Sequence, residues 1–481
     1  MDAIVISAFL LLAVVIFLTV NANWRSGVFA ILGVGFLQDM VRKLIPGEPV
    51  AITAAAAVTM LLVWQLGLAR NAKLGQEVGI RYYYPTIVKA FFALGVWVAL
   101  QAVQTFVTYG SPILAGIGLL AYLSPLPAIW VGWWYCQGER DYVEFLQVYV
   151  GFGVVVAIGV YLAWSGFEWA ILQQVGEKLV IYGLDGIVDL NAGFMRAPDI
   201  AGWHLGAATC FAITLAAARP KLQRTMMLAA VAAALVVAII LTGRRKPLGL
   251  VGLFVLIFAV MMQFSQNREA RKAAAVLFAL GIGMLGGSFF FLERGAGSES
   301  FSFLSDRSGT IFEDAWDRFY NLGIASIGWA IGEAAFLGNG AGVASQGAQH
   351  FGVELNDIGS AEGGLGKIVL ELGVPGLVVV AWVLMVFAKV MRQVVTMANR
   401  SEAQATTIAL ALVSFLLANL LLFITASQVF GDPFILILMG LVLGALLATP
   451  RLLGAGVAND ATRGSLRAYE RGRANPNLGR R

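Results

Sequence analysis

Long apolar stretches recur along nearly the whole chain, and short polar segments separate them. Most are long enough to cross about 30 Å of hydrocarbon as a helix, and about thirteen are candidate membrane spans. Within each stretch the apolar residues are continuous and do not alternate with polar ones, which favours helices over a closed barrel. The candidate spans are residues 3–20, 26–40, 50–69, 86–107, 113–135, 143–164, 201–218, 225–242, 247–263, 273–292, 366–388, 405–426 and 432–449.

The composition agrees with this pattern. Of the 481 residues 59% are hydrophobic and 13% are charged, whereas a soluble domain carries about 25% charged residues. The mean hydropathy is +0.80. We therefore predict an all-α polytopic membrane protein with about twelve or thirteen transmembrane helices. The first twenty residues have an acid near the start and no basic segment, so we expect a retained first helix rather than a cleaved signal peptide.

The spans and loops divide the chain into six regions. They are N-terminal transmembrane helices (1–164), an outer-face loop (165–200), central transmembrane helices (201–292), a large periplasmic loop (293–365), C-terminal transmembrane helices (366–449) and a basic tail (450–481). The tail is expected to be disordered and to lie beside anionic lipid headgroups in the cytoplasm.

Positive charge in the loops predicts the topology. Cations occur in the loops 70–85, 219–224, 264–272 and 389–404. If each apolar stretch crosses once, these loops and the basic tail share one face, which the positive-inside rule assigns to the cytoplasm. The N-terminus is then periplasmic and the C-terminus cytoplasmic.

The turn LTGRRKPLGL, residues 241–250, breaks this rule. Its cations Arg244, Arg245 and Lys246 fall on the outer face and have no acid within the turn to pair with. An anionic ligand would explain their position. The alternative is that their side chains reach headgroup phosphates of the outer leaflet.

The large outer loop holds two further features. Apolar residues at three- and four-residue spacing predict an amphipathic helix over about 311–322. The glycine-rich stretch LGNGAGVASQGAQHFG follows it. This stretch lacks the Gly-Lys-Ser/Thr ending of a phosphate loop, so we expect a close approach of its backbone to neighbouring helices or to a ligand.

Several motifs together resemble one family. They are LELGVPG at 370–376, the TGRRK turn, and GNGAG after an arginine-bearing helix. As a set they resemble the O-antigen polymerase and O-antigen ligase superfamily, over roughly 190–390. SAEGGLGK, with Glu362, and RAPDIAGWH are more similar to the polymerase-like branch.

The resemblance implies a GT-C-like fold and metal-independent, inverting glycosyl transfer at the periplasmic face of the bacterial inner membrane. Donor and acceptor would be polyprenyl-diphosphate-linked glycans, polymerised into a surface polysaccharide. A ligase acting on lipid A core is the alternative, and a lipid-linked glycan flippase or transporter is a further one. No cofactor and no nucleic acid are expected. A chain-length regulator and a flippase would be partner proteins.

The resemblance also implies roles for individual residues. The catalytic base would be Glu362 or His350. The diphosphate-binding residues would be Arg244, Arg245, Arg318 and Arg196, and Asp199 and His204 are candidate substrate contacts. By their own chemistry Lys246 is a further candidate for diphosphate binding or for a lipid headgroup, and Trp316, Tyr320 and Trp329 are candidates for stacking on sugars or for anchoring at the membrane interface. Paired guanidinium groups suit a departing diphosphate, because they stay charged and bind in a bidentate manner. No acidic pair suited to a metal accompanies them on the outer face.

Four of these residues have a structural alternative. Arg318 could pair with Asp314, four residues earlier on a helix. Arg196 could pair with Asp199, and Glu362 could pair with Lys367. His204, inside the start of a span, could be a helix-packing residue.

Overall fold

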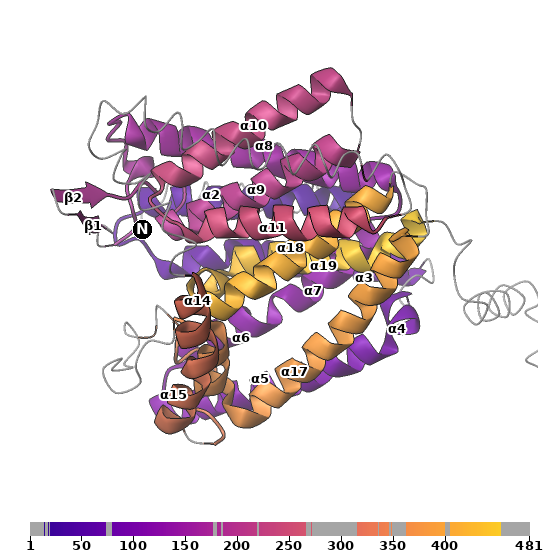
Figure 1. The fold of residues 1–481 in the computed structure, drawn as a ribbon. Helices are drawn as coiled ribbons and strands as arrows, with labels where there is room; N and C mark the ends of the chain where they lie inside the picture. Colours follow the sequence, from indigo (N-terminus) through magenta and orange to yellow (C-terminus); the bar gives the residue numbers. More distant parts are fainter. Residues whose placement is uncertain are drawn as a thin grey trace, which may run out of the picture.

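The computed structural model describes residues 14, 18, 20–73, 79–176, 180–183, 186–218, 221–265, 271, 315–334, 336–345, 348, 362–399 and 405–453. This part of the chain is predominantly helical (Figure 1). Ten of its helices are long and apolar enough to cross a membrane, which indicates a multi-pass membrane protein. They are Val50–Ala69 (mostly in α3, Ala55–Lys73), Pro85–Tyr109 (α5), Pro112–Tyr135 (α6, Pro112–Leu123, and α7, Pro125–Tyr135), Glu139–Trp164 (α8), Pro198–Ala218 (α9), Leu222–Leu241 (α10), Lys246–Gln263 (α11), Gly364–Asn399 (α17), Ala405–Thr425 (α18) and Pro433–Pro450 (in α19, Pro433–Leu452).

Each of these ten helices coincides with a predicted span, and three predicted spans are left over. Apart from residues 14, 18 and 20, the stretches 3–20 and 273–292 lie outside the described residues. The stretch 26–40 forms α2 (Gly27–Leu44), which has the length of a span. Its last two turns hold Asp39, Arg42 and Lys43, and α2 is not among the ten. The total of twelve or thirteen spans therefore stays a prediction.

One strand pair interrupts the helical fold. β1 (Val180–Gly183) and β2 (Gly186–Asp189) form an antiparallel hairpin within the predicted outer loop 165–200. Valine and isoleucine favour an extended backbone, and a glycine at each inner end suits a tight turn. The all-α prediction therefore holds for the apolar helices but not for this hairpin.

Helix α9 forms the centre of the bundle. Its apolar window is completely buried, and it packs against α8, α10, α11 and α18. Small residues permit these contacts: a Cβ at Gly202 would lie 2.7 Å from Pro247 of α11. The first turns of α9 and α11 therefore lie side by side, which decides where the TGRRK turn is placed.

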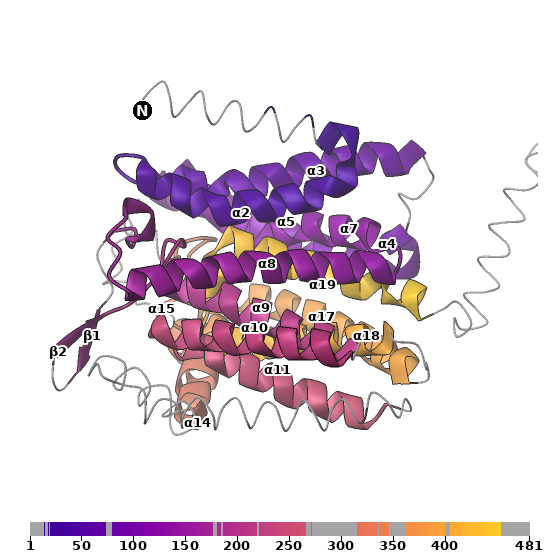
Figure 2. The same ribbon diagram turned by 90° about the horizontal axis from the view of Figure 1, so that it is seen from above.

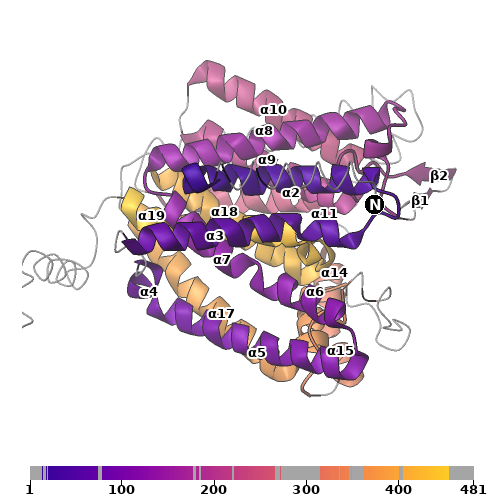
Figure 3. The ribbon, with the colours of Figure 1, turned by 180° about the vertical axis from the view of Figure 1, so that it is seen from behind.

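The two ends of the bundle differ. The hairpin, α14 (Ala315–Arg318) and α15 (Ser326–Glu333) lie at one end, and the short helix α4 (Gly79–Tyr83) lies at the other (Figures 1 and 2). The view from behind in Figure 3 shows the same separation. We call the end with α14 and α15 the loop end. It gathers the segments predicted to face the periplasm, although the side of the membrane itself stays a prediction.

Helix α17 is broken at its LELGVPG motif. Gly373 has a φ of +70° within the helix, a conformation that disfavours side chains, and Pro375 follows without a backbone N–H. Carbonyl and N–H groups around the break are thus released from regular helical bonding. The indole of Trp97 donates to the Leu372 carbonyl at 2.9 Å, and the Val374 N–H donates to the Phe336 carbonyl at 3.0 Å.

The GNGAG stretch, residues 338–342, docks against this break. Its glycines Gly338, Gly340 and Gly342 all have positive φ, and their Cα atoms approach α17, α5 and α6 respectively. A Cβ at Gly338 would lie 2.5 Å from the nitrogen of Gly373. The predicted close approach of this backbone is therefore made to neighbouring helices.

A buried carboxylate holds the same loop. Glu371 is 0% exposed; Tyr122 donates its hydroxyl proton to it at 2.5 Å and the Ala344 N–H donates at 3.0 Å. Gln104 donates from α5 to the Gly338 carbonyl at 2.8 Å. The described part of this loop is thereby hydrogen-bonded to α17 and α5, and through Glu371 it is connected to Tyr122 of α6.

Candidate functional site: a cationic turn and two pockets at the loop end

The TGRRK turn joins α10 to α11 at the loop end. Gly243 has a φ of +70°, and the buried Thr242 hydroxyl donates to the Ile239 carbonyl at 2.6 Å. The Arg244 N–H lies 3.3 Å from the same hydroxyl oxygen. Pro247 is the second residue of α11, and it suits the first turn because its missing N–H would have no helical partner there. This local geometry presents Arg244, Arg245 and Lys246 in succession at the bundle surface.

Arg244 has an acidic partner from another helix. Its guanidinium group lies 3.0 Å from the carboxylate of Asp199, in the first turn of α9. An acid there also complements the positive end of the helix dipole. The turn itself holds no acid, as its sequence shows, and the packing of α9 supplies one.

The ion pair leaves part of Arg244 unused. Its Nε–H is buried and has no hydrogen-bond partner within the described part of the chain. A buried donor without a partner is costly unless a ligand satisfies it. Arg245 beside it is half-buried.

Lys246 connects this turn to the late part of the chain. Its ammonium group lies within electrostatic range of the charges of Asp199, Glu362, Arg244 and Arg318. Its nearest described hydrogen-bond acceptor is the amide oxygen of Gln428, at 3.5 Å. The turn that holds Arg244 and Lys246 is thus brought to the same end of the bundle as Arg318 and Glu362, which lie far from it in sequence.

Glu362 is held by its backbone and leaves its carboxylate exposed. The Ser427 N–H and hydroxyl both donate to the Glu362 carbonyl oxygen, at 2.8 and 3.0 Å. Among the described residues Glu362 and Lys367 form no ion pair, so the predicted structural alternative for this acid is absent. Its side chain lines two pockets at this end of the bundle.

The glycines after Glu362 explain the SAEGGLGK motif. A Cβ at Gly363 would collide with the Leu322 carbonyl, one at Gly364 with the Phe423 carbonyl, and one at Gly366 with Ser326 at 2.9 Å. Gly363 and Gly366 let the start of α17 pack directly on the helix that contains α14 and α15, and Gly364 lets it pack on α18. Between those two, Phe319–Ala325 is π-helical, a form often found at functional sites.

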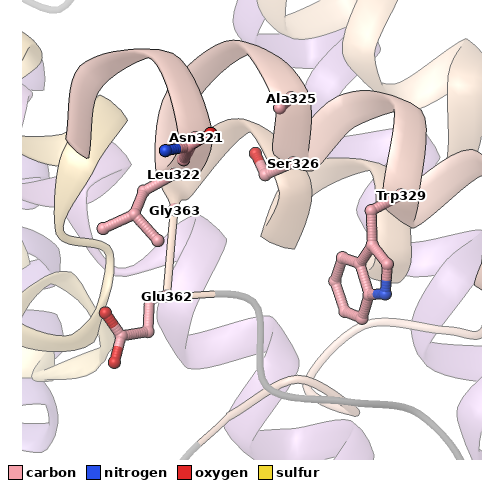
Figure 4. A pocket seen from close by; sticks show the side chains of 7 residues that line it. All are labelled: Asn321, Leu322, Ala325, Ser326, Trp329, Glu362 and Gly363. Carbon is pink, nitrogen blue, oxygen red and sulfur yellow. The ribbon is translucent and has the colours of Figure 1, made fainter. Parts of the chain in front are cut away.

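Two pockets lie where these segments meet. The first, of about 260 Å³, is shown in Figure 4 with Glu362 and Trp329 on opposite sides. The second, of about 330 Å³, adjoins it on the charged side. The first is lined by Asn321, Leu322, Ala325, Ser326, Trp329, Glu362 and Gly363, and the second by Asp317, Arg318, Asn321, Leu322 and Glu362.

Arg196 lies apart from this pocket in a buried ion cluster. Its guanidinium group is 2.5 Å from the carboxylate of Asp432 and 3.5 Å from that of Asp39. The backbone N–H of Arg196 also donates to the Asp39 carboxylate, at 3.0 Å. Burial lowers the pKa of Arg196, but the two carboxylates outweigh burial and raise it above its usual value. Asp199, the partner expected from the sequence, binds Arg244 instead. Two carboxylates on one guanidinium group oppose diphosphate binding there.

His204 is a packing residue in this structure. It is 0% exposed and lies between Phe36, Trp203 and Phe434, and its Nδ1 is 2.6 Å from the Tyr149 hydroxyl. Its Nε2 has no hydrogen-bond partner in the described ranges. The environment matches the structural alternative predicted for this histidine, and it separates His204 from the pocket.

The other predicted residues fall in three positions. Arg318 is exposed and lines the second pocket. Trp316 and Tyr320 are 72% and 53% exposed and line neither pocket. His350 and Asp314 lie outside the described residues, so a base at His350 and an Arg318–Asp314 pair stay predictions.

The sequence reasoning missed several residues of this site. Asn321 and Ser326 line the first pocket, and Gln428 reaches Lys246. Asn321, Ala325 and Trp329 recur at four-residue spacing, so one helix face could have been recognised. Gln428 carries no such signal, because only tertiary packing brings it to the TGRRK turn.

The fold and site define a multi-pass membrane protein with a cationic turn and two adjoining pockets at one end. No protein-family model matches the chain, and no curated protein matches it either.

Proposed function

We propose that the protein is a glycosyltransferase that polymerises polyprenyl-diphosphate-linked oligosaccharide repeat units at the periplasmic face of the bacterial inner membrane. The observation that carries this proposal is the convergence of Glu362 with Lys246, Arg244 and Arg318. An exposed carboxylate among cations suits a reaction that removes a proton and releases a diphosphate.

Each group has a task in this reaction. The oxygen of an acceptor hydroxyl forms a bond to C1 of the donor sugar, and the bond from C1 to the diphosphate oxygen breaks. The electron pair leaves with the diphosphate, and the hydroxyl proton passes to Glu362 acting as general base. Arg244, Lys246 and Arg318 stabilise the charge that develops on the diphosphate.

The ion pair between Arg244 and Asp199 supports this assignment. A fixed guanidinium group needs little reorganisation when the anion binds, and preorganised charge is the main contribution to such catalysis. Lys246 and Arg318 approach from different helices, so a diphosphate between them would be bound on more than one side.

The test is a transfer assay with purified protein in nanodiscs, given lipid-linked repeat units extracted from the cells that make them. A ladder of multiples that persists in EDTA is the expected result. Transfer only after addition of lipid A core would replace the polymerase with a ligase. Absence of transfer to both acceptors, together with movement of the lipid-linked units across vesicles, would overturn the enzyme proposal in favour of a transporter.

A further inference from the structure

The two pockets that meet at Glu362 differ in chemistry. The first has the indole of Trp329, the small side chain of Ala325 and no cation among its lining residues. The second replaces these with Asp317 and Arg318. Glu362 belongs to both, and so do Asn321 and Leu322. One carboxylate therefore stands at the boundary between a compartment without a cation and one that also holds Asp317 and Arg318.

We infer that the first pocket is the acceptor subsite, in which a sugar ring of the acceptor glycan lies against the indole of Trp329. The inference rests on the proposed function and adds the substrate that each compartment takes. A diphosphate requires cations, and Arg318 is the one cation in the lining of these two pockets, so the donor diphosphate belongs on its side, toward the TGRRK turn. An uncharged saccharide requires an apolar surface and a few polar groups.

The geometry of the first pocket fits a sugar ring. A pyranose presents a face of C–H groups, and an indole offers a flat, rigid, apolar surface with one polar N–H. The indole of Trp329 is 38% exposed, and Ala325 one turn earlier leaves the space beside it open. The volume of about 260 Å³ is below the usual range of about 300–1,000 Å³ for drug-sized ligands, which suits one sugar ring rather than a lipid tail.

The position of Glu362 supplies the second argument. The base must reach the acceptor hydroxyl while that hydroxyl faces C1 of the donor. A carboxylate on the wall shared by the two compartments meets both conditions. Asn321, on the same wall, places an amide where it can hydrogen-bond a sugar hydroxyl (Figure 4).

The experiment separates acceptor binding from donor binding. The acceptor probe is the repeat-unit oligosaccharide as an alkyl glycoside, which has no diphosphate and cannot act as a donor. With saturating lipid-linked repeat unit, Trp329→Ala should raise the KM for this probe about tenfold or more, because the variant lacks the aromatic surface that the sugar would cover. The KM for the donor and its slow hydrolysis by water should stay unchanged. Trp329→Phe, which keeps a ring, should restore most of the acceptor affinity.

Trp169→Ala is the matched control, since Trp169 is 51% exposed, packs on Phe167 and lines neither pocket. Each variant must elute as the wild-type protein does in size-exclusion chromatography, and Trp329→Phe carries the test if the alanine variant aggregates.

Each outcome decides the matter. An unchanged acceptor KM in Trp329→Ala, with an active wild-type protein, would make Trp329 an interfacial anchor and overturn the inference while leaving the proposed function intact. A raised donor KM instead would reverse the two compartments and also overturn it. An inactive wild-type protein would overturn the proposed function, and the inference with it.

Discussion

Arg244 and Asp199 form an ion pair of 3.0 Å between the turn that precedes α11 and the first turn of α9. The pair directs the guanidinium group while leaving its buried Nε–H without a partner among the described residues. Asp199 therefore orients Arg244 and does not saturate it, which is the arrangement that an anion site between helices requires.

Replacement of Arg244 by lysine tests this arrangement. An ammonium group can keep the ion pair with Asp199, but it has no Nε–H to offer a phosphate oxygen. We expect Arg244→Lys to weaken donor binding about ten- to hundredfold, because a hydrogen bond to a charged group contributes about 1.5 to 3 kcal/mol. Titration with the lipid-linked repeat unit measures this change in affinity. Arg140→Lys, exposed in the first turn of α8, is the control, and equal affinity in all three proteins would remove Arg244 from the site.

Replacement of Glu362 by glutamine tests the base. The amide keeps the size of the side chain but accepts no proton, so the transfer rate should fall about 10²- to 10⁴-fold while donor binding persists. Single-turnover kinetics separate the two quantities. Glu333→Gln, on the exposed side of α15, should behave as wild type. Normal transfer by Glu362→Gln would shift the base to His350, which His350→Gln then tests.

The break in α17 should be intolerant of a side chain. Gly373 has a positive φ, and its Cβ would collide with the backbone of Leu337 and Phe336. We expect Gly373→Ala to destabilise the fold by at least about 2 kcal/mol, because strain and collision add. Thermal unfolding in detergent measures the loss. Gly95→Ala is the control, since no atom lies within 4 Å of its Cβ position. Equal melting temperatures would show that α17 is regular at this point.

Loss of Arg196 should reduce stability, because the cluster it joins is buried. Arg196→Met leaves the carboxylates of Asp39 and Asp432, both about 1% exposed, without their cation. Removing one partner of a buried ion pair costs about 3 to 5 kcal/mol. Adding Asp39→Asn should recover part of this loss in thermal unfolding. A stable Arg196→Met protein that no longer binds donor would instead support the diphosphate role predicted for Arg196.

Stability should depend on Lys43 at alkaline pH. Lys43 donates to the carbonyls of Ile171 and Gly193 at 3.0 and 2.7 Å, which ties α2 to the segment after α8. Burial lowers the pKa of Lys43 from 10.5 to about 8, although Asp39 and Glu48 oppose the shift. The unfolded chain therefore binds more protons between these two pKa values, and stability rises with pH across that window.

The comparison with Lys43→Met isolates this effect. The free energy of unfolding of the wild type, relative to the variant, should increase by about 2 kcal/mol from about pH 7 to about pH 9.5. Melting temperatures in detergent, measured for both proteins at each pH, give the difference. A constant difference between the two proteins would show that Lys43 titrates normally.

The apolar helices were predictable because their signal is local. A continuous apolar stretch of sufficient length has one stable solution in hydrocarbon, a helix with its own backbone bonds satisfied. The ten helices identified in the structure all fall on predicted spans. The GNGAG stretch was likewise predictable as a close backbone approach, since only glycine adopts its positive φ values without strain.

The hairpin over 180–189 and the broken start of α17 were less accessible. Short valine- and isoleucine-rich segments suit a strand or part of a buried helix equally well, and only pairing with a second strand decides between them. The break at Gly373 depends on the loop at 336–345, whose backbone groups bond to those that the break releases.

The sequence by itself determined which cations and acids stand outside the apolar helices, because charge cannot enter hydrocarbon without a partner. Only the tertiary structure decided which of them meet. Asp199 binds Arg244 rather than Arg196, Arg196 binds Asp39 and Asp432, and Lys246 lies within electrostatic range of Glu362. These relationships follow from the packing of α9 against α11 and of α17 against α15 and α18. The helical period in a sequence marks which face of a helix is packed but not which other helix it packs against.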